Sequence, residues 1–72
     1  MNNAIKYEVI IYWSDGDDAF ITEVPDLPGC MADGDSYETA LANAQIVIRQ
    51  WIETAESLGR EIPKPRVRMQ VA

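Results

Sequence analysis

The stretch from Phe20 to Leu41 constrains the fold more than any other part of this 72-residue chain. It changes from alternating apolar residues, through a turn with two prolines and a glycine, to apolar residues at helical spacing. Alternation is typical of strands, and three- and four-residue apolar steps are typical of an amphipathic helix. The stretch therefore predicts an α+β domain in which strands and a helix meet at a rigid turn.

Alternation elsewhere in the chain extends the sheet to four strands. They are expected at Ile5–Trp13, Phe20–Val24, Cys30–Asp33 and Arg66–Val71. In the first strand, the odd-numbered residues are expected to face the core. Ile10 and Tyr12 then lie on the opposite face, either in ordinary cross-strand packing or as a contact surface for another chain.

One long helix is expected from Tyr37 to Leu58. Asp35, with Glu38 in a capping box, or Ser36 would cap its start, and Gly59 would end it. The expected core stripe is Ala40, Leu41, Ala44, Val47, Ile48, Trp51, Ile52, Ala55 and Leu58. A right-handed crossover then places the fourth strand parallel to the first. The prediction is a single domain, residues 1–72, with a mixed sheet of order 3-2-1-4 and the helix on one face.

Two features of the turns allow alternative interpretations. Asp15, Asp17 and Asp18 crowd one hairpin turn, but they lack the spacing of a calcium-binding loop, so a solvated turn is expected. Leu27 lies at the apex of the proline turn. It either fills the space under that turn or is presented to a partner together with Asp26.

Charge defines the class of partner. Twelve acidic residues against six basic ones give a formal charge of -6, which disfavours binding to nucleic-acid backbones and attracts basic partners. Up to Gly59 there are two cations and eleven carboxylates, whereas from Arg60 onward the chain is basic. The single cysteine and the lack of a signal peptide or a membrane-spanning apolar run predict a cytoplasmic protein.

The residue types argue against an enzyme. The chain has no histidine, no phosphate-binding glycine loop and no paired-cysteine metal motif, so neither a cofactor nor a metal is expected. Cys30 has no base to activate it and is expected to be a packing residue, as is Trp51. A metal-dependent nuclease using Glu8, Glu23 and Asp26 is the remaining catalytic interpretation, although no sequence pattern singles these carboxylates out.

The turn sequence EVPDLPGC, followed by an acidic helix cap and an Ala-Leu helix start, is the most specific motif. The residues that carry it and continue it are Trp13, Ser14, Phe20, Glu23–Cys30, Ala32, Gly34, Glu38, Ala40, Leu41, Asn43, Trp51, Ile52, Gly59, Ile62, Pro63 and Pro65. With these residues the chain resembles the HicB family of type II toxin-antitoxin antitoxins. The resemblance implies a partial RNase-H-like β-β-β-α-β fold and no nuclease activity. The chain departs from the fuller family pattern, in which a C-terminal DNA-binding segment follows, because no helix is predicted after its last strand. We therefore expect a short form, and direct DNA binding is not expected.

The resemblance also implies a partner, a small basic HicA-like toxin that cleaves mRNA and is neutralised when the antitoxin occludes its active site. We expect Glu23, Asp26, Leu27 and Pro28 near the centre of this interface, with Asp15, Asp17 and Asp18 at its rim. A homodimer or higher oligomer is also expected. The alternative is a self-associating interaction or regulatory domain that has no toxin partner and assembles through its open sheet edge or bare sheet face.

Overall fold

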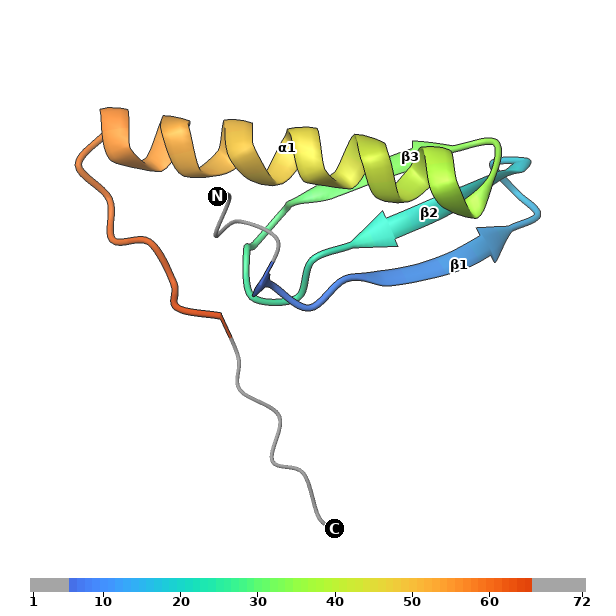
Figure 1. The fold of residues 1–72 in the computed structure, drawn as a ribbon, viewed down its shortest axis with the longest axis horizontal. Coiled ribbons are helices and arrows are strands. Elements are labelled where there is room, and N and C mark those ends of the chain that lie inside the picture. The colour runs from blue at the N-terminus through green and yellow to red at the C-terminus, as the bar shows by residue number, and fades with distance from the viewer. Residues whose placement is uncertain (1–5, 66–72) are drawn as a thin grey trace, which may run out of the picture.

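In the computed structural model, which describes residues 6–65, one long helix lies across a three-stranded antiparallel sheet (Figure 1). The elements are β1 (Ile10–Ser14), β2 (Ala19–Glu23), β3 (Met31–Gly34) and α1 (Tyr37–Ser57). The strand order β1-β2-β3 and the α+β class agree with the prediction. The predicted fourth strand, Arg66–Val71, lies outside the described residues.

The strand register gives the sheet two different faces. Ile11, Thr22 and Ala32 share one row that faces α1, and the Thr22 hydroxyl donates to the Ala40 carbonyl over 3.2 Å. Because side chains alternate along a strand, the neighbouring row, which contains Tyr12 and Ile21, points away from the helix. No element described in residues 6–65 lies over that second face (Figure 1).

Within the described residues the first strand is shorter than predicted, because it begins at Ile10 and residues 6–9 are not part of it. Its pairing with β2 ends at Glu23: the Val24 N–H bonds to the Cys30 carbonyl on the β3 side, and Pro25 has no N–H to donate. Residues 7–9 leave the sheet and approach the helix. Tyr7 is buried there, and its hydroxyl donates to the Pro63 carbonyl.

Two consecutive turns connect β2 to β3. The Leu27 N–H donates to the Val24 carbonyl, and the Cys30 N–H donates to the Leu27 carbonyl, each over 3.0 Å. Gly29 has a φ of 76°, a conformation that other residues rarely adopt. The proline-flanked segment is therefore a hydrogen-bonded turn, as predicted, and β3 starts one residue later than expected.

The helix ends are capped by the side chains and backbone near them. Ser36 is the N-cap and its hydroxyl accepts from the Thr39 N–H, so the capping box predicted from Asp35 is wrong and the alternative, Ser36, is confirmed. At the other end, the N–H groups of Gly59 and Arg60 donate back to the last turn, in the pattern of a Schellman motif. The prediction that Gly59 ends the helix is confirmed.

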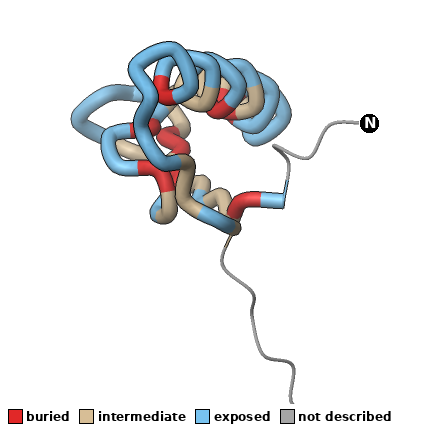
Figure 2. The backbone as a smooth tube through the Cα atoms, turned by 90° about the vertical axis from the view of Figure 1, so that its left-hand side faces the viewer, coloured by how far each residue is buried: buried red, intermediate tan, exposed pale blue. Residues whose placement is uncertain are grey.

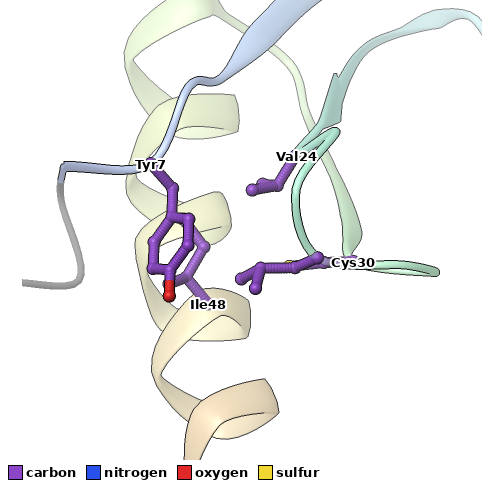
Figure 3. Packing of buried hydrophobic residues seen from close by; sticks show 5 residues of the cluster. Tyr7, Val24, Cys30 and Ile48 are labelled. Atoms are coloured by element: carbon purple, nitrogen blue, oxygen red, sulfur yellow. The ribbon is translucent and has the colours of Figure 1, made fainter. Parts of the chain in front are cut away.

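The core lies between the helix and the strand layer, where the buried positions gather (Figure 2). Tyr7 lies against Ile48 of α1, and Val24 and Cys30 approach them from the opposite side (Figure 3). Most of the predicted stripe is buried or half-buried, but Leu41 and Leu58 are 39% and 61% exposed. Leu58 is already the C-cap residue, at the end of the helix.

The helix packs mainly over β3 and β2 and only slightly over β1. Trp13 therefore remains 45% exposed, although it shares the helix-facing row of Phe20 as predicted. Its ring packs edge-on against Phe20 at a centroid distance of 5.0 Å, and Phe20 lies 4.3 Å from Tyr37. These aromatic contacts link the hairpin end of the sheet to the first residue of the helix.

Gly34 is the point of closest approach between sheet and helix. A Cβ atom there would lie 2.5 Å from the Ala40 nitrogen and 2.8 Å from the Thr39 carbonyl carbon, both of which are backbone atoms. We expect Gly34→Ala to lower the free energy of unfolding by about 1–3 kcal/mol, because overpacking forces the backbone to shift. Gly16→Ala is the control, since a Cβ there has nothing within 4 Å. Urea unfolding measures both, and equal midpoints would refute this close approach.

Ionisation of Tyr7 is expected to lower the free energy of unfolding at alkaline pH. Its pKa is raised, first by burial and then by the charge of Asp26. Stability is therefore complete below the unfolded-state pKa of about 10 and falls as pH rises through the higher folded-state pKa. We expect Tyr7→Phe to lose about 1 kcal/mol at pH 7, from the missing hydrogen bond to Pro63, and to show a shallower fall in stability above pH 10.

The measurement for Tyr7 is urea unfolding at a series of pH values from 7 to 11. The pKa values of Tyr12 and Cys30 are raised as well, so the variant should keep part of the fall. Identical pH dependence in the variant and the parent chain would contradict the assignment to Tyr7.

Candidate functional site

The proline turn is held from inside by Leu27, whose side chain is completely buried. The Trp51 indole N–H donates to the Pro28 carbonyl over 2.9 Å, so the helix also fixes the outer part of the turn. The Leu27 side chain therefore fills the space under the turn, as the structural interpretation predicts. The predicted contact of Leu27 with a partner stays a prediction, and in this structure its side chain has no exposed surface.

The other predicted central residues are divided between two surfaces. Pro28 is exposed and Asp26 is half-buried on the turn, where the Asp26 charge contributes to the raised pKa of Tyr7. Glu23 precedes the turn and pairs with Ile10 on the sheet face that points away from the helix. Of the four residues predicted at the centre, Glu23 alone therefore has its side chain on the open sheet face.

The predicted acidic rim lies at the other end of the sheet. Asp15, Asp17 and Asp18 occupy the β1–β2 turn, whereas the proline turn follows the far end of β2 (Figure 1). The Trp13 indole N–H donates to Asp15 Oδ1 over 2.7 Å, and the Ser14 hydroxyl donates to Asp17 Oδ2 over 3.0 Å. Two of these carboxylates thus stabilise the hairpin itself.

The hairpin carboxylates do not form a recognisable metal site. Within residues 6–65, no group of three or more His, Cys, Asp or Glu side chains is arranged to hold a metal ion. Asp18 adopts a positive φ of 51°, which turns the chain into β2. Side-chain hydrogen bonds and the backbone conformation of Asp18 thus define the shape of this turn.

The open sheet face carries three exposed apolar side chains, whereas the exposed Trp13 belongs to the helix-facing row. Ile10 is 45% exposed and Tyr12 is 41% exposed on β1, and Met31 is 51% exposed on β3. Between them, on β2, Ile21 is only 8% exposed. The sequence identified Ile10 and Tyr12 as a possible contact surface but missed Met31. The strand register could have located Met31, because it places this residue in the same row as Ile10 and Glu23.

The charged strand side chains on the open face are the carboxylates of Glu23 and Asp33. The Tyr12 hydroxyl donates to Glu23 Oε2 over 2.8 Å. This hydrogen bond, followed by desolvation and by the charges of Glu23 and Asp17, raises the pKa of Tyr12. The exposed Asp33 lies in the row of Tyr12 and Ile21. No lysine or arginine occurs in β1, β2 or β3, so the strands contribute only negative charge.

Two other residues discussed in the sequence analysis, Cys30 and Trp51, have packing roles. Cys30 is buried, and burial raises the pKa of its thiol, which keeps the sulfur protonated and unreactive at neutral pH. Trp51 is half-buried and lines a groove of about 450 Å³ together with residues that include Pro28, Leu58 and Pro63. Both residues support the turn and its contact with α1.

Comparison with known proteins gives a consistent set of matches. Residues 7–71 match the family described as HicB-like antitoxin of bacterial toxin-antitoxin systems. A UPF0150 protein of Synechocystis sp. is 34% identical over 59 residues, covering 82% of this chain and 80% of that protein. A UPF0150 protein of Thermoplasma acidophilum is 38% identical over 60 residues, covering 83% of this chain and 86% of that protein.

A more distant match comes from a virus. An uncharacterized 14.9 kDa protein of Haemophilus phage HP1 is 38% identical over 47 residues, which span 65% of this chain and 35% of the phage protein. No solved structure gives a significant match. Among the described residues, no helix is long and apolar enough to cross a membrane.

A matched pair of leucine variants tests the burial of Leu27. Leu27→Ala should lower the free energy of unfolding by about 2–5 kcal/mol, because it leaves a cavity in a fully enclosed site. Leu58→Ala removes the same atoms from a side chain that is 61% exposed, and should change stability by about 0.5 kcal/mol or less. Thermal unfolding distinguishes them, and similar melting temperatures for the two variants would show that Leu27 does not fill the turn.

Proposed function

The chain belongs to the HicB-like antitoxin family of bacterial toxin-antitoxin systems, and from this we propose that it binds and neutralises a small basic HicA-like toxin that cleaves mRNA. In this proposal the antitoxin acts by occupying the toxin's active site. The family match confirms the resemblance predicted from the EVPDLPGC turn. The toxin and the mode of neutralisation are the proposed part.

The observation that carries the proposal is the concentration of negative charge on a small rigid sheet. The strands contain no basic residue, and the hairpin adds three exposed carboxylates, Asp15, Asp17 and Asp18. A toxin that cleaves mRNA needs a basic surface to bind the phosphate backbone. An acidic protein surface is complementary to the same basic surface, which accelerates encounter and excludes RNA by competition.

The structure-based proposal keeps most of the predicted contact residues. Glu23 on the open face and the hairpin carboxylates present negative charge, and Asp26 and Pro28 lie on the proline turn. Leu27 contributes from below, by holding that turn in one conformation. Neutralisation by occlusion needs one antitoxin per active site and no chemical step by the antitoxin.

The remaining parts of the prediction belong to this proposal as well. A fourth strand beside β1 would complete the partial RNase-H-like sheet, and homo-oligomers and a cytoplasmic location accompany the antitoxin role. The alternative is a self-associating domain without a toxin, which would use an open sheet edge or the uncovered sheet face. The two functions differ in whether a second, basic protein is required.

Co-expression tests the antitoxin function. The protein encoded by the reading frame next to this chain, which the proposal expects to be small and basic, is expressed in bacteria with and without the antitoxin. We expect growth arrest and mRNA cleavage from the neighbour alone, and restored growth together with co-purification when both are present. An unrelated acidic protein of similar size is the control for non-specific charge. If the neighbour is neither bound nor made less toxic, the antitoxin proposal is rejected.

A further inference from the structure

We propose that the open face of the sheet, centred on Ile10, Tyr12 and Met31, is the surface that docks against the basic partner. This inference rests on the proposed antitoxin function and assigns its interface to one side of the molecule. It also moves the centre of the interface from the proline turn, where the sequence placed it, to the middle of the sheet.

The apolar content of this face is the first argument. Ile10, Tyr12 and Met31 each keep 41–51% of their surface exposed, and they come from the two outer strands of the sheet. Protein interfaces typically have an apolar centre in which aromatic residues and methionine are enriched. The row formed by Ile10, Glu23 and Met31 crosses the whole described sheet, so these residues form a continuous surface.

The rigidity of the face is the second argument. The side chain of Tyr12 is fixed by its hydrogen bond to Glu23, 2.8 Å long, which crosses from β1 to β2. Ile21 is packed between the outer strands and holds the centre of the face. A surface whose side chains are already ordered loses less conformational entropy on binding than a mobile one.

Charge decides which kind of partner fits this face. Glu23 and Asp33 are its charged side chains, and Asp17 is near enough for its charge to influence Tyr12. A second copy docked face to face would place these carboxylates against their own equivalents, with no strand lysine or arginine to compensate. Like charges brought together in an interface are costly. A partner with cationic residues around an apolar centre satisfies both the carboxylates and the exposed side chains.

The test uses a matched pair of isoleucines. Ile10 is 45% exposed on the open face, and Ile46 is 48% exposed on the helix, which packs against the other face. Ile10→Arg and Ile46→Arg add the same charge and remove the same apolar group. With the small basic protein encoded by the adjacent reading frame as probe, calorimetric titration should show binding weakened at least about tenfold by Ile10→Arg and less than about threefold by Ile46→Arg.

Met31→Arg is the second variant on the open face and should behave as Ile10→Arg does. Thermal unfolding of each variant verifies that the fold is retained, and at least one of the two exposed positions is expected to tolerate arginine. Neutralisation in cells provides a second readout, in which Ile46→Arg still rescues growth and the open-face variants do not.

The possible failures separate the two proposals. If the parent chain binds the probe and folded open-face variants bind as well as Ile46→Arg, this interface is wrong and the antitoxin function stands. If the parent chain does not bind the probe, the antitoxin function is wrong, and the proposed interface, which depends on it, is rejected as well. If sedimentation shows a dimer of the parent chain that Ile10→Arg converts to a monomer, the face is a contact between copies and the inference is overturned.

Discussion

The packing of the proline turn against the helix is the interaction on which the rest of the structure depends. Leu27 is completely buried between them, and Trp51 donates to the Pro28 carbonyl. Because β2 and β3 emerge from the two ends of this turn, fixing it against α1 fixes the sheet beneath the helix. A domain of this size has a small core, so one enclosed leucine is a large part of its stability.

This arrangement places all the helix packing on one face of the sheet and leaves the other face open. The helix-facing row is closed tightly enough that Gly34 has no space for a side chain. The opposite face keeps Ile10, Tyr12 and Met31 exposed among carboxylates. For the proposed binding of a basic toxin, an acidic sheet with an apolar centre would provide charge complementarity for encounter and apolar area for affinity.

Local sequence patterns predicted the elements well where the signal is periodic or a cap residue is present. The helix was expected at Tyr37–Leu58 and is found at Tyr37–Ser57, and Gly59 ends it. The first strand was predicted too long, because residues 7–9 alternate like a strand but have no partner strand to pair with beyond Glu23. Alternating apolar residues indicate which side chains share a face of a strand. Whether the strand is paired depends on where its neighbour ends, and β2 ends at Glu23, before the proline turn.

The sequence by itself determined the strand-turn-strand-helix order, the acidic character and the family of this protein, since these depend on residue type and local spacing. The tertiary structure alone decided which exposed residues form one surface. It buried Leu27, separated the hairpin carboxylates from the proline turn by the length of β2, and joined Met31 to Ile10 through the strand register. The physical reason is that a surface is made by residues distant in the chain, and their proximity is set by strand pairing and by the side of the sheet that the helix covers.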